Sequence, residues 1–253
     1  MSATGPSRVT YVGHATVLAE LGGVRLLTDP VLRSRVGPLR RRGAAPPAAV
    51  GERLDAVLIS HLHRDHVDLP SLRRIGREVP LLVPPGAGEF FARRGFPAVT
   101  ELAPGESTRV GEVAVTAVEA DHEGARRGAA DAEAIGFLLE AERRVYFAGD
   151  TDLFDGMAGL AGDLDLALLP IWGWGPSLGP GHLDPERAAR AAALLSPRVA
   201  VPIHWGTLYP AGLARLRPDP LRQPPRRFAA AVRELAPQVE VRVLAPAEAT
   251  SLA

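Results

Sequence analysis

The chain has 253 residues, of which 46% are hydrophobic and 23% are charged, a composition typical of a globular protein with a sizeable buried core. Its 29 basic and 29 acidic residues balance, so no overall positive field would hold nucleic acid, and no nucleic-acid partner is expected. The chain contains no cysteine, which excludes disulfides, thiolate metal sites and a cysteine nucleophile and leaves nitrogen and oxygen atoms as metal ligands.

The N-terminal part of the chain is predicted to be rich in strands. Apolar alternation predicts three short strands, at residues 9–12, 16–21 and 24–27. Residues 33–51 are rich in Arg, Gly, Pro and Ala without periodicity, which predicts a surface loop. The apolar run 56–59 then predicts a buried strand that ends directly at His61.

The rest of the chain alternates between helical and strand patterns. The expected helices cover residues 69–76, 87–95, 185–195 and 228–235. The expected strands cover residues 81–83, 99–102, 110–120, 135–140, 143–148, 164–169, 199–203 and 239–244. Asp184 is placed as the N-cap of the third helix, with Pro185 in its first turn. This order predicts one domain over residues 1–253, with two sheets face to face and helices outside.

The sequence offers no membrane or export signal. The N-terminal residues lack a basic start followed by an apolar run of about 7 to 15 residues, and no stretch reaches the roughly 18 apolar residues of a membrane span. We therefore expect a cytoplasmic protein. The sequence does not indicate its oligomeric state.

Histidines gather where predicted strands end. The densest group is His61-Leu62-His63-Arg64-Asp65-His66, directly after the buried strand. On a helix, His61 and His63 would point to different faces, so this segment is expected to be a loop in which two imidazoles converge on one ion while Asp65 and His66 face a second. A solvated polar loop is the alternative, but four such groups crowded after a buried strand are costly unless something neutralises them.

Further ligand candidates follow other strands. A catalytic zinc usually takes three protein ligands, so one loop cannot complete the coordination of two ions. His122 is the candidate third imidazole for the first ion, and His204 completes the second ion. Asp150 is placed to bridge the two ions. Taken singly, each of these residues could instead be a polar cap or a hydrogen-bonded core residue.

In this order, these residues resemble the metallo-β-lactamase superfamily. Further motifs are similar to its branch of N-acyl-phosphatidylethanolamine-type phospholipases D and sugar-phosphate lactonases, and the similarity covers about 200 residues. The motifs are Tyr11-Val12-Gly13-His14-Ala15-Thr16, Leu27-Thr28-Asp29-Pro30, Val57-Leu58-Ile59-Ser60-His61, residues 165–170 followed by His182-Leu183-Asp184-Pro185-Glu186, and Ile203-His204-Trp205-Gly206-Thr207.

The resemblance implies an α+β fold, a four-layer αββα sandwich of two mixed sheets, with two divalent metal ions at the shared edge of the sheets. It implies that the first ion is held by His61, His63 and His122. It implies that the second is held by Asp65, His66 and His204, with Asp150 bridging. Asp29 would be a carboxylate that fixes the orientation of a ligand. These ligand types suit zinc, iron or manganese, and zinc is favoured.

Such a centre predicts a hydrolase that attacks an ester-type bond with a hydroxide bound to the two ions, on a small anionic ester substrate. A phosphodiester, as in a phospholipase D, is favoured over a lactone or carboxylic ester, and a nuclease is weaker because the net charge is zero. A non-catalytic metal-binding or ligand-sensing protein would require an incomplete ligand set. Asp65 is counted as catalytic, and His14 or His182 is predicted to protonate the leaving group or bind a substrate oxyanion, with a structural role as the alternative.

Three segments bear on the substrate. Residues 123–134 form a short, charged segment that is poor in aromatics, unlike the corresponding stretch of the phospholipase relatives, so the resemblance by itself does not imply a lipid substrate. Trp172-Gly173-Trp174-Gly175 predicts either an aromatic wall above the site or packed tryptophans. The early loop carries arginines that could grip a phosphate or an anionic membrane, but a solvated loop is favoured, and with it no peripheral membrane contact. These are Arg33, Arg35, Arg40, Arg41 and Arg42.

Overall fold

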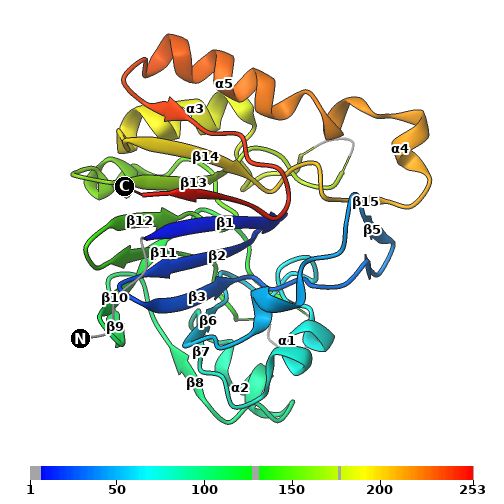
Figure 1. The fold of residues 1–253 in the computed structure, drawn as a ribbon, viewed down its shortest axis with the longest axis vertical. Coiled ribbons are helices and arrows are strands. Elements are labelled where there is room, and N and C mark those ends of the chain that lie inside the picture. The colour runs from blue at the N-terminus through cyan, green and yellow to red at the C-terminus, as the bar shows by residue number, and fades with distance from the viewer. Residues whose placement is uncertain (1–6, 127–130, 176–177, 253) are drawn as a thin grey trace.

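A computed structural model describes residues 7–126, 131–175 and 178–252, which form two seven-stranded sheets lying face to face (Figure 1). In the first sheet, an antiparallel part is followed by a parallel part that begins where β3 pairs with β6. Its strands, in sheet order, are β17 (Glu248–Ser251), β1 (Arg8–Gly13), β2 (Thr16–Leu21), β3 (Val24–Thr28), β6 (Ala56–Leu58), β7 (Leu81–Val83) and β8 (Val99–Glu101).

The second sheet is also mixed, with parallel pairing among β12, β13, β14 and β16. Its strands, in sheet order, are β16 (Glu240–Val241), β14 (Val199–Ile203), β13 (Leu166–Pro170), β12 (Arg144–Phe147), β11 (Ile135–Glu140), β10 (Val113–Glu119) and β9 (Ser107–Val110). Because parallel strands end at the same edge, the loops that follow them in both sheets are brought to one side of the sandwich.

Helices cover the outer faces of the two sheets (Figure 1). Helices α1 (Leu69–Ile75) and α2 (Gly88–Ala92) pack on the first sheet, while α3 (Pro185–Leu195) and α5 (Pro224–Leu235) pack on the second. Successive residues of a strand point to opposite faces, so Val57 of β6 packs among the α1 and α2 side chains while Leu58 packs between the sheets. These four layers confirm the predicted αββα sandwich.

The start of α3 agrees with the sequence prediction in detail. The Asp184 carboxylate accepts a hydrogen bond of 2.7 Å from the backbone N–H of Arg187, and proline follows the cap. This bond satisfies one of the backbone donors that a helix N-terminus leaves free. It fixes the start of α3 three residues after His182.

One prediction of secondary structure is wrong. The expected loop 33–51 contains β4 (Arg35–Val36), β5 (Leu39–Arg41) and η1 (Ala48–Gly51), because β5 pairs with β15 (Leu208–Pro210), a strand far away in the sequence. The expected strand 110–120 is present as β10, which begins at Val113 because Gly111, at φ +54°, turns the chain between β9 and β10. Six further short elements were not predicted: β9, β15, β17, η2 (Asp155–Leu160), α4 (Leu213–Leu216) and η3 (Asp219–Leu221).

Among the described residues, no helix combines the length and the apolar character needed to span a membrane. The expectation of a single domain over residues 1–253 stays a prediction.

Candidate metal centre

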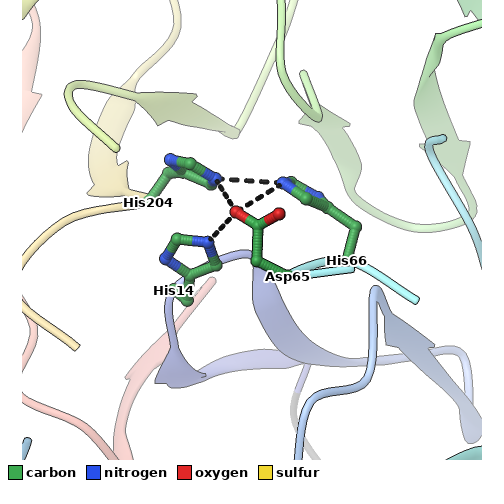
Figure 2. A group of neighbouring side chains, drawn as sticks. All are labelled: His14, Asp65, His66 and His204. Carbon is green, nitrogen blue, oxygen red and sulfur yellow. Dashed lines mark hydrogen bonds and ion pairs between the residues drawn. The ribbon is translucent and has the colours of Figure 1, made fainter. Parts of the chain in front are cut away.

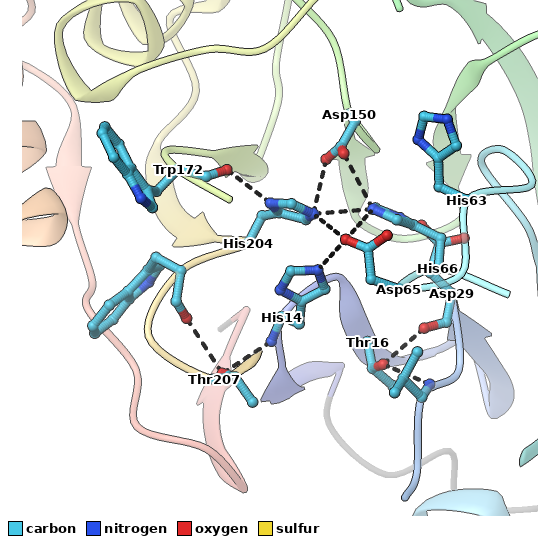
Figure 3. Close-up of polar contacts among 12 residues, drawn as sticks. His14, Thr16, Asp29, His63, Asp65, His66, Asp150, Trp172, His204 and Thr207 are labelled. Carbon is cyan, nitrogen blue, oxygen red and sulfur yellow. Dashed lines mark hydrogen bonds and ion pairs between the residues drawn. The ribbon is translucent and has the colours of Figure 1, made fainter. Parts of the chain in front are cut away.

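All seven side chains predicted to bind metal come together at the edge where the parallel strands end. Figure 3 labels five of them: His63, Asp65, His66, Asp150 and His204. They follow β6, β10, β12 and β14, and His14 and His182 join them. Potential ligand atoms lie within 4.8 Å of one another in four overlapping groups: His14, Asp65, His66 and His204; His61, His63 and His122; His61, His66 and Asp150; and His122, Asp150 and His182.

We call His61, His63 and His122 the first group, and His14, Asp65, His66 and His204 the second. In the first group, three imidazoles turn one nitrogen each toward the others. His122 Nδ1 donates to the carbonyl oxygen of Gly181 at 2.8 Å, which leaves its Nε2 as an acceptor 3.2 Å from Nδ1 of His63. Ser60 Oγ donates to Asp29 at 2.6 Å and lies 3.0 Å from His61 Nδ1, so it accepts the His61 proton. The Nε2 atom of His61 is buried and has no hydrogen-bond partner among the described residues.

The second group contains two histidines held in the same way. His66 Nδ1 donates to Asp29 at 2.8 Å, and His204 Nδ1 donates to the carbonyl oxygen of Trp172 at 2.7 Å. Their Nε2 atoms then face each other at 3.0 Å, each as an acceptor. Asp65 Oδ2 lies 3.8 Å and 3.6 Å from these two atoms. Two lone pairs at this distance repel unless a cation lies between or beside them.

Asp150 lies between the two groups (Figure 3). Its Oδ2 is 3.9 Å from Nε2 of His61 and 3.1 Å from Nε2 of His66, and its Oδ1 is 3.3 Å from Nε2 of His204. Oδ1 is buried and has no hydrogen-bond partner among the described residues. This carboxylate thus lies within 4 Å of ligand atoms from both groups, and the unpartnered atoms of His61 and Asp150 fit cations better than an apolar core.

Asp29 fixes the loop that carries the histidine run, residues 60–66, through hydrogen bonds. Its buried carboxylate accepts hydrogen bonds from the backbone N–H of Ser60 at 2.8 Å and from Ser60 Oγ and His66 Nδ1. Asp29 itself has φ +37°, an uncommon conformation for a residue other than glycine. Ser60, for which the sequence predicted no role of its own, therefore links Asp29 to His61. Its position directly before the histidine run was the available signal.

The electrostatics of the two groups differ. Burial lowers the pKa of His122 to about 4 and holds the pKa of His61 well below its ordinary value, so these rings are neutral. Burial also acts on His66 and His204, but the nearby Asp150 outweighs it, together with Asp29 at His66 and Asp65 at His204, and raises the pKa of both rings. The first group is thus ready to bind a cation, whereas protons compete for the second.

His14 belongs to the second group (Figure 2). It is buried, with φ +61°, and its Nε2 donates to Asp65 Oδ2 at 2.9 Å while its ring lies 3.8 Å, centroid to centroid, from that of His204. Its backbone is held at both ends: the N–H donates to Tyr11 Oη and Thr207 Oγ1, and the carbonyl accepts from the His204 N–H at 2.9 Å. This geometry favours a positioning role over direct contact with substrate.

His182 has the opposite environment. About a quarter of its side chain, 24%, is exposed, and it lines the large pocket beside the centre. Its Nδ1 donates to the carbonyl oxygen of Pro180 at 2.9 Å, so its Nε2 faces the centre, 3.6 Å from Asp150 Oδ2. Of the two extra histidines, His182 is therefore the one that a bound molecule can reach.

The predictions for the surrounding segments hold only in part. Two of the five arginines of the early loop have side-chain partners outside that loop. Arg33 pairs with Asp68 at 2.6 Å, and the buried Arg41 donates to the carbonyl oxygens of Val12 and Val31. The other three, Arg35, Arg40 and Arg42, are exposed. Trp174 lines the pocket, whereas Trp172 turns its indole N–H to Gly175 and orients His204 through its carbonyl. The segment 123–134 includes residues 127–130, which lie outside the described residues.

Comparison with known proteins identifies the family. Residues 24–205 match the family model described as the beta-lactamase superfamily domain. The chain belongs to this superfamily. The prediction of the metallo-β-lactamase superfamily from the histidine and aspartate motifs is therefore confirmed.

Several relatives within this superfamily carry functional names. A protein of Rubrobacter xylanophilus, named a metal-dependent hydrolase, is 34% identical over 257 residues, covering 96% of each chain. The N-acyl-phosphatidylethanolamine-hydrolyzing phospholipase D 1 of Caenorhabditis elegans is 33% identical over 241 residues, covering 83% of this chain and 67% of that protein. The predicted class, a metal-dependent hydrolase, agrees with these names.

Relatives of greater length and a solved structure complete the comparison. An uncharacterized protein of Mycobacterium tuberculosis is 34% identical over 241 residues, and the present chain spans 63% of its length. The structure of a metallo hydrolase from Ignicoccus hospitalis has a TM-score of 0.74 and 26% identity, covering 97% of this chain and 98% of that one. The two structures match over nearly the whole length of both chains, which supports the beta-lactamase superfamily fold.

Proposed function

We propose that this chain is a metal-dependent hydrolase of small anionic esters and that the bond it cleaves is a phosphodiester. The observation that carries the proposal is the convergence of seven nitrogen and oxygen ligand groups beside a pocket of about 590 Å³. Pockets of several hundred Å³ commonly hold small molecules. The choice of a phosphodiester is supported by the 33% identity to a protein named a phospholipase D.

The proposed ligand sets follow the two groups of side chains. His61, His63 and His122 would hold one ion. Asp65, His66 and His204 would hold the other, with Asp150 between them. When bound there, two divalent ions would lower the pKa of a water molecule and polarise an ester oxygen. Imidazole and carboxylate ligands suit zinc, iron and manganese, and zinc is our first choice.

The residues of the chain set up the charge of the site. Two divalent cations against the carboxylates of Asp65 and Asp150 leave the centre positive, which attracts an anionic ester. Burial would raise the pKa of Asp65, but hydrogen bonds from His14 and His204 outweigh it and hold this pKa well below its ordinary value. Asp65 is thus ionised and fixed in place before a substrate arrives, which avoids the cost of reorganising it during the reaction.

We assign the transfer of a proton to the leaving group to His182. It is the histidine whose Nε2 faces the centre while its side chain remains accessible from the pocket. The hydrogen bond from Nδ1 to Pro180 fixes the ring, so that a proton gained by the ring would be carried at Nε2, toward the centre. His14, which is buried and does not line the pocket, is assigned to the orientation of Asp65.

The experiment is a substrate panel on protein loaded with zinc, iron or manganese, comparing 4-nitrophenyl phosphodiesters, lactones and thioesters. We expect kcat/KM to be highest for the phosphodiesters. Preferential turnover of lactones would move the assignment to a lactone hydrolase with the same centre. If no ester is hydrolysed by protein that holds metal, the chain is a metal-binding protein and the enzyme proposal fails.

The role of His182 has its own test within this panel. Protonation matters little for a good leaving group such as 4-nitrophenolate and much more for an alkoxide. We expect His182→Ala to lower kcat for dialkyl phosphodiesters by a larger factor than for 4-nitrophenyl esters, with metal content unchanged. An equal loss for both kinds of ester would exclude proton donation by His182.

A further inference from the structure

The pocket beside the metal centre has two chemically different parts. Its floor carries the ligand carboxylates and the accessible His182. Its walls are apolar and come from two segments: the tip of the β4–β5 hairpin, residues 36–39, and the loop after β13, which supplies Trp174 and Leu178. A substrate whose ester group lies on the floor therefore meets apolar surface immediately beyond it.

The hairpin wall is anchored in the fold by packing, strand pairing and hydrogen bonds. Val36 and Leu39 are buried in a small cluster with Val31 and Leu208, while they present an edge to the pocket. β5 pairs with β15, the strand that follows His204, and the buried Arg41 fastens β5 to the backbone carbonyls of Val12 and Val31. This wall is therefore built into the same part of the fold as the metal ligands and is formed before any ligand binds.

Charged and hydrogen-bonding side chains outside the metal centre are scarce in the lining of the pocket. Among the described residues that line the pocket, Arg64 is the one with a permanent positive charge, and the remaining polar side chains are those of the centre itself. Recognition of a second phosphate or of several hydroxyl groups needs several directed donors, such as paired arginines. Trp174, by contrast, is a large aromatic side chain left 40% exposed, an apolar surface available for a ligand to cover.

We propose that the substrate ester carries an apolar substituent, an alkyl or aryl group, which packs against Trp174, Leu178 and the hairpin tip. Building on the proposed function, this places the ester on the metal centre and makes the two walls the determinants of specificity. The enzyme would thus prefer apolar esters over esters of sugars or of phosphorylated sugars, because burying unpaired hydroxyl or phosphate groups against these walls costs free energy.

The test is a homologous series of alkyl 4-nitrophenyl phosphodiesters, from methyl to hexyl, with a parallel series of γ-alkyl lactones. Each methylene buried in an apolar site contributes a factor of about two to four in affinity for the transition state, so kcat/KM should rise by about that factor for each methylene until the pocket is filled. A flat or falling series, or better turnover of a sugar phosphate lactone than of any alkyl ester, would overturn the proposal.

Variants locate the effect. Trp174→Ala should reduce the gain for each methylene to less than about twofold, and Trp174→Phe should keep most of it, because phenylalanine preserves apolar surface. Leu216→Ala is the matched control: Leu216 is 80% exposed on α4 and does not line the pocket, so the gain should stay as in the wild type. If kcat/KM of Trp174→Ala rises with each methylene as steeply as in the wild type, the alkyl substituents do not bind at this wall.

Binding measurements separate this proposal from the proposed function. Alkylphosphonates, which are not hydrolysed, are titrated into metal-loaded protein by calorimetry. If no ester is turned over but phosphonate affinity rises with chain length and falls in Trp174→Ala, the hydrolase proposal fails and the apolar site stands. If the esters are hydrolysed but neither kcat/KM nor phosphonate affinity depends on chain length, the apolar site fails and the hydrolase stands.

Discussion

The Nε2 atoms of His66 and His204 lie 3.0 Å apart, although the Nδ1 atom of each ring already donates its proton, to Asp29 and to the Trp172 carbonyl respectively (Figure 3). Both Nε2 atoms are therefore acceptors, and a positive charge is needed between or beside them. A shared proton would suffice for this one pair. A metal ion also accounts for Asp65 within 4 Å of both atoms and for the unpartnered oxygen of Asp150.

His14 provides a test of how Asp65 is oriented. Because His14 Nε2 donates to Asp65 at 2.9 Å, His14→Ala should weaken binding of the second ion by about 10- to 100-fold, as loss of a hydrogen bond to a ligand commonly does. His14→Gln keeps an N–H donor and should recover part of the affinity. Metal affinity is measured by competition with a chromogenic chelator, and the first ion serves as the internal control.

The outcome for His14 also separates orientation from general destabilisation. His14 has a structural role if two results are found together. His14→Ala then weakens the binding of both ions equally, and His14→Ala and His14→Gln lower the melting temperature by the same amount. If neither variant changes metal affinity, the contact with Asp65 has no part in metal binding.

Acidification should remove the two ions in a fixed order. Burial lowers the pKa values of His66 and His204, but Asp150, together with Asp29 at His66 and Asp65 at His204, outweighs it and raises both, so protons compete for these rings from neutral pH downward. Burial lowers the pKa of His122 to about 4, so the ring stays neutral and free for metal well below neutral pH. Between pH 7 and pH 5, the ion at His66 and His204 should be lost first.

The order is measured by dialysis of metal-loaded protein at stepwise lower pH, followed by metal analysis. In His122→Ala, which removes a side chain of the first group, the ion that remains is the one at His66 and His204. This variant should lose that ion at the higher of the two pH values at which the wild type releases its ions. Loss of both ions in one step, or retention of the second ion to the lower pH, would contradict the assigned electrostatics.

Gly13 is a position where the backbone supports the site. It has φ +126°, and a Cβ atom placed there would lie 2.7 Å from Thr207 Cγ2 and 2.8 Å from Arg41 Nη1. Gly13→Ala should destabilise the protein by about 2 to 4 kcal/mol, the sum of backbone strain and overpacking. Gly105→Ala is the control, because Gly105 has φ +89° but open space around it, and should cost only the strain, about 1 to 2 kcal/mol. Urea unfolding of both variants checks this, and equal losses would show that the contacts at Gly13 relax.

Much of the fold could be predicted because the strands carry their own signal. Alternation places Val57 and Leu58 on opposite faces of β6, and both faces are covered in the structure. The pairing of β5 with β15 could not be predicted, because it depends on a partner far away in the sequence and on the burial of Arg41 against backbone carbonyls. An arginine in a polar, proline-rich segment carries no local sign of such burial.

The candidate site was more predictable than its details. A dense run of histidines after a buried strand marks the centre, and His122, Asp150 and His204 each follow a strand that ends at the same edge. Which nitrogen of each histidine ring carries the proton could not be predicted from the sequence. Several of the groups that fix the proton are backbone carbonyls, such as those of Gly181 and Trp172. The contact of His14 with Asp65 likewise depends on the turn after β1 lying against the ligand loop.

Metal analysis of purified protein measures whether the seven side chains bind a pair of cations. After equilibration with zinc, iron or manganese and removal of free metal, the wild type should hold about two ions per chain. His122→Ala and Asp65→Ala should each hold about one, while Asp152→Asn, a buried acid outside the ligand groups, should hold two. Equal metal content in the wild type and both ligand variants, or less than one ion per chain in the wild type with every metal, would show that these side chains do not form a two-ion centre.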